Sequence, residues 1–499
     1  MRSSRLVSLL LAMAMPVQLV SAQTQTPAPA ENHSVEERLQ AIEDKLQQLE
    51  KRLDAATQTT AAARDKTAAA PSGDRLEAFD QKIRVLERNR ELDQEAALAK
   101  TKETPILTAG PEGFSISNAD KSYRFKLGGY AQADGRFFYD DPTHALISTF
   151  NVRRARLNFD GTVGKYVDFR IAPEFGNGSV TLLDAYGDVR FKPYVVLRGG
   201  KFKDPVGLEV LANDTELTFI ERSLVNDIMP GRDTGFYLYG DIGGRFTYQA
   251  GYVNGAPDGG NIDLDVNKGK DAVARVFFTP FAKGGPSFLS GLGFGLGVSS
   301  GRQNGTAAAP NLASFKTTAG QATFFAYNTG AAATFAAGRR IRWSPQMYYY
   351  NGPFGFMGEY VEEVEVVSNA ASGAHELNNY AWQVTGSWVI TGEKKSYRGV
   401  VPKRRLGERK FVPSTGAWEV AGRYTVLQVD PATFTLAYVN PTTQMETARA
   451  WGIGLNWYLN KNVKVSGDYE QTYFRKNVLS AGSVRPDEKT FLQRLQFAF

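Results

Sequence analysis

Two clusters of arginines are the side chains in this sequence best suited to binding an anion. They have identical spacing: Arg153, Arg154 and Arg156, and Arg339, Arg340 and Arg342. A guanidinium group presents a fork of N–H donors that fits the oxygens of a phosphate or a carboxylate. A neighbouring carboxylate can equally neutralise an arginine, so the role of each cluster depends on the element that carries it.

The segment around the first cluster alternates apolar and polar residues with a period of two, which is typical of a β-strand. Leu157 and Phe159 fall on one face, and Arg154 and Arg156 fall on the other. We therefore predict that Arg154 and Arg156 face a polar interior. Arg153 would point the other way on a regular strand, so we expect it at the start of the strand, at a bulge or near a subunit interface.

Other basic residues are candidates for the same interior. Arg170 and Arg190 fall on the polar faces of two later alternating segments. Lys201 and Lys203 precede an Asp-Pro pair, but the alternation of their strand does not fix which way they point. For the second arginine cluster two interpretations stay open, a lining of the interior or a rim that contacts lipid headgroups or lipopolysaccharide.

Acidic and glycine residues complete the polar faces. Glu359, Glu363 and Glu365 share one face of an alternating segment, opposite Tyr360 and Val364. Carboxylates on an interior face would repel anions. The glycines at 291, 293, 295 and 297 alternate with apolar residues, which predicts a strand whose interior face carries no side chains.

The composition argues against enzymatic, metal-binding and nucleic-acid-binding functions. Cysteine is absent, and the three histidines, His33, His144 and His375, have no metal-site spacing. Asp263 and Asp265 resemble a calcium loop only in part, because the glycine comes one place late. We expect no catalytic residues, no metal and no cofactor, and the dispersed basic residues do not form a nucleic-acid-binding stripe.

The alternation continues from residue 106 to residue 499, with aromatic residues near segment ends. Segments of about ten residues separated by turns, with apolar outer faces and polar inner faces, are typical of a transmembrane β-barrel. At roughly 24 residues per strand and connection, this region predicts about 16 strands. Phe491, Leu495, Phe497 and Phe499 share one face of the last segment, which favours a closing strand.

The N-terminal hundred residues have a different pattern. Residues 1–22 resemble a cleaved signal peptide, with Arg2 and Arg5 before an apolar run and Ala22 at a small-residue cleavage site. Residues 23–34 are a linker. Residues 35–95 carry one heptad seam over 35–54 and a weaker one over 76–86, which predicts a helical coiled coil. A single amphipathic helix packed on the barrel is the alternative.

The barrel region resembles the phosphate-selective porin family, the porin O and P type. The resemblance rests on short motifs that occur in the family's order: Phe125-Lys126-Leu127-Gly128-Gly129, Arg153-Arg154-Ala155-Arg156, Asp184-Ala185-Tyr186, Gly207-Leu208-Glu209, Glu221-Arg222, Thr391-Gly392-Glu393, Gly416-Ala417-Trp418-Glu419-Val420, Leu455-Asn456-Trp457-Tyr458 and Arg494-Leu495-Gln496.

The resemblance implies a 16-stranded homotrimer in the bacterial outer membrane, inserted by the barrel-assembly machinery and with an arginine ladder in its pore. The chain departs from phosphate-binding members between Val210 and Glu216, where it has no lysine. We therefore expect a diffusive porin with a mild preference for small anionic solutes. The alternative is an envelope-tethering or adhesive trimer whose coiled coil touches the cell wall and whose barrel is mainly an anchor.

Overall fold

The structure, a computed structural model, describes residues 47, 51, 73–103, 105–140, 146–261, 263–265, 267–407, 415–478 and 485–499. The chain divides into two units, residues 1–95 and 96–499. The expected signal peptide, the linker and all but two positions of the first heptad seam lie outside the described residues.

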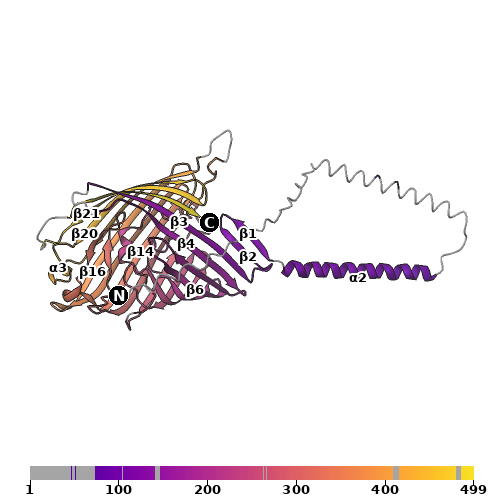
Figure 1. The fold of residues 1–499 in the computed structure, drawn as a ribbon, viewed down its shortest axis with the longest axis horizontal. Coiled ribbons are helices and arrows are strands. Elements are labelled where there is room, and N and C mark those ends of the chain that lie inside the picture. The colour runs from indigo at the N-terminus through magenta and orange to yellow at the C-terminus, as the bar shows by residue number, and fades with distance from the viewer. Residues whose placement is uncertain are drawn as a thin grey trace, which may run out of the picture. The chain divides into compact units, whose positions relative to one another are not determined.

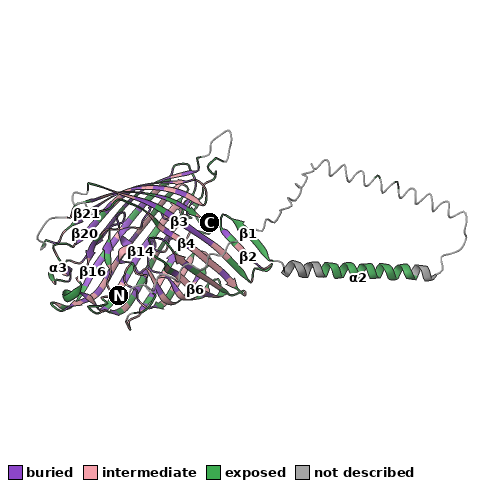
Figure 2. Cartoon of the chain, in the orientation of Figure 1, coloured by how far each residue is buried: buried purple, intermediate pink, exposed green. Residues whose placement is uncertain are grey.

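Helix α2 (Gly73–Glu103) precedes the barrel in the sequence. Its described side chains, residues 77–95, are all exposed (Figure 2). They include Phe79, Ile83 and Leu86 of the second seam. A helix was expected here, whereas its assembly into a coiled coil stays a prediction. Among the described residues, no helix has the length and hydropathy needed to cross a membrane.

The second unit is an antiparallel β-barrel (Figure 1). Sixteen strands close into the barrel, which confirms the predicted fold. They are β3 (Arg124–Tyr139), β4 (Thr149–Val163), β5 (Val167–Glu174), β6 (Thr181–Lys192), β7 (Val195–Lys203), β8 (Arg232–Ile242), β9 (Phe246–Val253), β10 (Asp271–Phe278), β11 (Leu292–Asn304), β14 (Phe335–Asn351), β15 (Phe354–Asn369), β16 (Gly373–Val389), β19 (Ala417–Gln428), β20 (Thr447–Tyr458), β21 (Val463–Arg475) and β22 (Glu488–Ala498).

The strands alternate between an apolar outer face and a polar inner face. On β22, Leu495 and Phe497 are half exposed, whereas Arg494 and Gln496 are buried. A soluble barrel would bury its apolar face instead. An apolar outer face with a polar interior is the arrangement that a hydrocarbon solvent requires.

The barrel closes where β22 pairs with β3. Phe499 extends this pairing, since its N–H and C=O each bond to the backbone of Gly129, at 2.9 and 3.0 Å. A hairpin of β1 (Ile106–Gly110) and β2 (Gly113–Ser117) continues along the same edge of β3. Phe114 of β2 packs beside Phe499, with the ring centres 6.4 Å apart.

The connections differ between the two ends of the barrel. At one end most connections are short turns, such as residues 164–166, 193–194 and 243–245, although those after β10 and β16 are longer, and Phe499 lies at this end. Short turns mark the periplasmic end of such barrels, and long loops mark the extracellular end. Three long connections, residues 204–231, 305–334 and 429–446, leave from the opposite end and contribute buried side chains.

These three connections form an apolar core with the inner wall of β15, β16 and β19. The first contains the short helix η1 (Leu224–Ile228), the second the hairpin β12 (Ser314–Lys316) and β13 (Thr323–Ala326), and the third the helix α3 (Ala432–Thr435). The core includes Leu224, Ile228, Phe315, Phe325, Val361, Leu427, Phe434 and Tyr438. Part of the lumen is therefore filled like the core of a globular domain.

Candidate functional site

Residues 204–231, here called the inward loop, cross the barrel interior and hydrogen-bond to the wall through their backbone. Glu359 of β15 accepts the N–H groups of Leu208 and Glu209, at 2.5 and 3.1 Å. Asp468 of β21 accepts the N–H of Ile220 at 2.6 Å. The loop thus gives its backbone donors to buried carboxylates on the wall, which satisfies both partners.

The inner face of β11 carries glycines in place of side chains, as the sequence pattern predicts. The inward loop occupies the space that they leave. A Cβ added to Gly297 would lie 1.9 Å from the carbonyl oxygen of Val206. Any side chain at Gly297 would therefore push the start of the inward loop away from the wall.

The first arginine cluster holds the middle of the inward loop. Gln132 pairs with Arg154 and Ala133 pairs with Val152, so Arg153 is the extra residue of a β-bulge. Because of the bulge, Arg153 and Arg154 both reach Glu221, at 2.8 and 3.4 Å.

Arg154 and Arg156 lie on the inner face where the alternation predicts them. Arg156 reaches Asp214 of the inward loop at 3.0 Å and Glu174 of β5 at 3.1 Å. Arg154 lies 3.7 Å from Asp214 as well. Both arginines therefore bind carboxylates of the protein itself.

Two carboxylates of the inward loop, Asp214 and Glu221, are each surrounded by several arginines. Burial alone would raise the pKa of Asp214, but Arg222, Arg154 and Arg156 hold it well below its usual range. In the same way, arginines of β4 and β22 hold the pKa of Glu221 well below its usual range, against the effect of burial. Both carboxyl groups are therefore ionised, and each fixes the loop to the wall.

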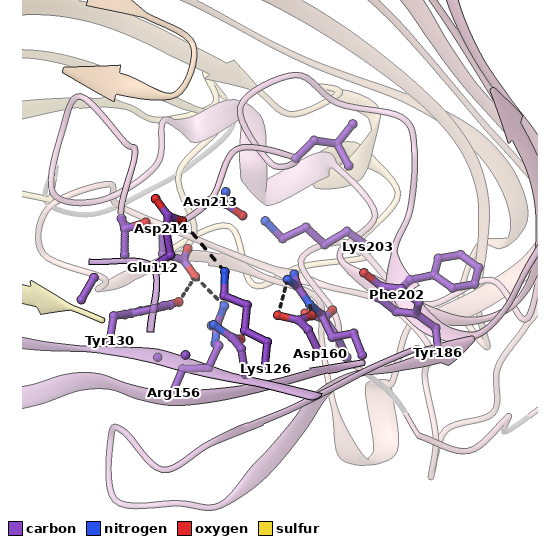
Figure 3. Close-up of a pocket in the computed structure, with 18 of the residues that line it drawn as sticks. Glu112, Lys126, Tyr130, Arg156, Asp160, Tyr186, Phe202, Lys203, Asn213 and Asp214 are labelled. Atoms are coloured by element: carbon purple, nitrogen blue, oxygen red, sulfur yellow. Dashed lines mark hydrogen bonds and ion pairs between the residues drawn. The ribbon is translucent and has the colours of Figure 1, made fainter. Parts of the chain in front are cut away.

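A cavity of about 470 Å³ lies between the inward loop and the end of the barrel with the short turns. Figure 3 shows residues that line it. Strands β3 to β9 form its wall, and Leu211, Asn213 and Thr215 of the loop border it. Seven basic side chains and four acidic side chains line it. The basic ones are Lys126, Arg156, Arg170, Arg198, Lys203, Arg232 and Lys461, and the acidic ones are Glu112, Asp160, Asp184 and Asp214.

Most of these basic groups are held by carboxylates. Arg170 pairs with Asp160 at 2.6 Å, and Arg232 pairs with Asp184 at 2.9 Å. Lys203 differs, because its ammonium donates to two backbone carbonyls of the inward loop, at 2.7 and 2.9 Å.

Arg198 has an aromatic environment in addition to its carboxylate. Its guanidinium lies 3.7 Å from the ring centre of Tyr186 and donates to Asp188 at 2.7 Å. Tyr237 and Tyr239 lie within 5.3 Å of the same group. A cation over an aromatic face is held by the quadrupole of the ring.

Several of the predicted lining residues do not border the cavity. Arg339 points outward on β14 and pairs with Glu376, with half of its side chain exposed, because the alternation puts it opposite Arg340 and Arg342. The expectation that Arg339 lines the interior is wrong. Lys201 is buried against Asp263 and the carbonyl of Leu182 and does not line the cavity.

Arg190 lies on the inner face near the short turns. It pairs with Asp168 at 2.6 Å, and 45% of its side chain is exposed. It lies outside the cavity but within reach of water.

Arg340 and Arg342 point inward but lie under residues 254–258, at the start of the connection between β9 and β10. Arg340 donates to the carbonyls of Gly255 and Ala256, at 3.0 Å each. Arg342 is fully buried and pairs with Glu363 at 3.2 Å and with Asp258. These two arginines hold a loop in place and do not face the cavity.

The three glutamates of β15 face inward as expected, but all are buried under loops. Glu359 binds the inward loop, Glu363 pairs with Arg342, and Glu365 accepts the hydroxyl of Tyr327 at 2.6 Å. The anion repulsion expected from this row is therefore reduced, because the carboxylates are used as anchors for loops.

Sequence reasoning did not single out other arginines that hold groups in the interior. Among them are Arg198, Arg222, Arg232, Arg423 and Arg494. Strand alternation could have placed Arg198 and Arg494 inside. Arg222 belongs to the inward loop, and no periodic pattern identifies which connection folds inward.

Among the described residues, no group of three or more acidic, histidine or cysteine side chains has a geometry that could hold a metal. Asp263 and Asp265 of the incomplete calcium motif pair with Lys201 and Lys270.

Comparisons with known proteins agree with this architecture. The profile of the family described as "Phosphate-selective porin O and P" matches residues 125–499. Porin O of Pseudomonas aeruginosa is 24% identical over 412 residues, which cover 78% of this chain and 91% of that protein.

Solved structures with a similar fold have low sequence identity. The outer membrane channel DcaP of Acinetobacter baumannii is 12% identical, with a TM-score of 0.49, over 78% of this chain and 99% of that one. An anion-selective porin from Comamonas acidovorans is 12% identical, with a TM-score of 0.47, over 76% of this chain and 100% of that one.

Proposed function

Because the chain belongs to the phosphate-selective porin O and P family, we propose that it is a porin with a preference for anions. Members of this family are bacterial outer-membrane channels for passive diffusion and are not enzymes. The preference itself is argued from the charges that face water in the barrel.

The observation that carries the proposal is the cavity under the inward loop. Its basic side chains outnumber its acidic ones by seven to four. The glutamates of β15, which would oppose an anion, are instead buried against loops and arginines. A basic passage with low-dielectric walls concentrates anions, and this effect decreases as salt screens the charges.

The test is the reversal potential of the purified channel in a gradient of potassium chloride across a planar bilayer. We expect chloride to be more permeant than potassium, with the ratio falling as ionic strength rises. Arg232→Gln removes one positive charge from the cavity and should lower this ratio. Arg339→Gln removes the same charge from the outer face and is the matched control. A cation-preferring channel, or equal effects of the two substitutions, would contradict the proposal.

We further propose that three copies associate through the outer face of β3. Between Phe125 and Phe137, the outward residues of this strand are Leu127, Gly129, Ala131, Ala133 and Gly135. Such small residues allow close approach within a membrane. The neighbouring β22 presents Gln493, a polar side chain that gains a partner in an interface. Since the chain has no cysteine, Ala133→Cys gives a single cross-linking site. Cross-linked species should form from Ala133→Cys and not from Val384→Cys on the outer face of β16.

The exposed apolar side chains of α2 favour a second role, attachment to the cell wall through a coiled coil. Phe79, Ile83 and Leu86 are 68%, 51% and 67% exposed. Apolar residues at this spacing gain stability by packing against other copies of the helix. The full chain should sediment with isolated cell wall, and a chain lacking residues 31–95 should not. Equal sedimentation of both would refute the tether.

We also propose that residues 1–22 are removed during export. The basis is the basic start, the apolar run and the small residues before the predicted cleavage site. The intact mass of the protein from outer membranes should correspond to a chain that begins at Gln23, and a mass that includes Met1 would refute it.

A further inference from the structure

The positive charges of the cavity are nearly all neutralised by the protein itself. Four of the seven basic groups are arginines, and each has a carboxylate partner within 3.1 Å. Lys126 and Lys461 both pair with Glu112. Among the described residues, Lys203 is the basic lining group with no carboxylate partner. The cavity therefore offers an entering solute one ammonium without a carboxylate, that of Lys203, while Lys126 and Lys461 share the single negative charge of Glu112.

The guanidinium forks of Arg198 and Arg170 are already occupied. Arg198 donates two hydrogen bonds to Asp188, both at 2.7 Å, and Arg170 donates two to Asp160, at 2.6 and 3.2 Å. Arginine recognises phosphate through this same pair of N–H groups. A multiply charged oxyanion would thus meet occupied donors and four nearby carboxylates.

Lys203 still has a donor available. An ammonium has three N–H groups, and the carbonyls of Val210 and Ala212 take two of them. Its side chain extends into the cavity toward Asn213 (Figure 3). The third N–H can therefore meet one oxygen of a solute, while the amide of Asn213 offers a second polar contact.

Aromatic rings form the wall beside Lys203. Phe202 is the preceding residue and packs edge-on against Tyr237, with ring centres 4.6 Å apart. Tyr186 borders the cavity on the same side. The volume of about 470 Å³ lies in the range of roughly 300–1,000 Å³ that small organic ligands occupy. The cavity thus offers one charge, a mostly polar lining and the edges of aromatic rings beside Lys203.

From this combination we infer that the cavity is a transit site for small organic monocarboxylates with an apolar or aromatic body, which it prefers to inorganic phosphate. Lys203 binds the carboxylate, and the ring of Tyr186, which is less deeply buried than Phe202 and Tyr237, contacts the body. The inference rests on the proposed function, because it names the class of anion that the basic passage favours. Matching one charge to one charge avoids repulsion from the acidic side chains.

The test uses the purified full-length channel in planar bilayers at pH 7, with chloride as the current carrier and benzoate, acetate or phosphate added. Benzoate should reduce the chloride current in a saturable manner, at lower concentrations than acetate or phosphate. Lys203→Gln should raise the half-blocking benzoate concentration about tenfold, the size expected when a hydrogen bond to a charged group is lost. Lys203→Arg, which keeps the charge, should retain the block.

Lys201→Gln is the matched control, since it removes the same charge from β7 outside the cavity. Benzoate should block the chloride current of this variant at the same concentration as in the wild type. Stronger block by phosphate, equal block by acetate and benzoate, or an unchanged block in Lys203→Gln would overturn the inference. A rise in chloride conductance in both Lys203 variants would show that the lysine only holds the loop, and would overturn it as well. A cation preference in potassium chloride would instead refute the proposed function, so the two failures are distinguishable.

Discussion

The strongest test of the architecture is the substitution Glu221→Gln in the inward loop. This carboxylate is buried and contacts Arg153 at 2.8 Å, Arg494 at 3.1 Å and Arg154 at 3.4 Å. The amide keeps the shape of the side chain but loses its charge. Arg494 retains Asp134, and Arg154 retains Asp214, whereas Arg153 has no other ion pair among the described residues.

The expected loss follows from the cost of breaking a buried ion pair, about 3–5 kcal/mol when one partner is removed. Part of this is recovered because the glutamine still accepts a hydrogen bond. A net loss of about 3 kcal/mol would shift the equilibrium between a docked and a released loop by about a hundredfold, since each 1.4 kcal/mol is a factor of ten. The barrel wall does not depend on this contact, so folding should be preserved.

Single-channel recording measures the shift directly. Glu221→Gln should show a larger mean conductance and more current noise, because the loop leaves the lumen more often. Glu216→Gln is the matched control: it is in the same loop and makes the same charge change, but Glu216 accepts a hydrogen bond from Asn213 and forms no ion pair among the described residues. Identical traces from the two variants would refute the anchoring role of Glu221.

Four other outcomes follow from the structure. Burial raises the pKa of Asp227 to about 8, so the docked loop favours its protonated form and loses stability as pH rises from 3.8 through about 8. Current noise should therefore grow over this range and level off above it; Asp227→Asn should remove this dependence, and its persistence would implicate another group. Gly297→Val should displace the loop and change the conductance, because its Cβ would meet the carbonyl of Val206, whereas Gly386→Val, with open space around the added Cβ, should not. Deleting Phe499 removes two hydrogen bonds of the barrel closure, so heating in detergent should unfold the barrel at a lower temperature and assembly in cells should slow; unchanged heat resistance would show that the closure does not need it. Deleting residues 31–95 should leave a heat-modifiable, detergent-stable barrel, and failure to form one would mean that the helical segment is needed for folding.

The sequence alone indicated the barrel and the direction of many of its side chains. A period of two identifies a strand and separates its faces, so the inward positions of Arg154, Arg156 and Glu359 could be read from their neighbours. The same rule separates Arg339 from Arg340 and Arg342, but only the structure of β14 shows that Arg339 is the outward one. The glycine alternation of β11 predicted a bare inner face before its occupant was known.

The tertiary structure decided what those inward side chains do. Periodicity gives the face of a residue but not its partner, because the partners of Arg154 and Glu359 come from the inward loop, which has no repeating pattern. Whether an arginine attracts a solute or holds a loop depends on distances to carboxylates far away in the sequence, and only folding sets these distances. For this reason the sequence could name the arginines, but only the structure separates the buried anchors, such as Arg342, from Lys203, which has no carboxylate partner among the described residues.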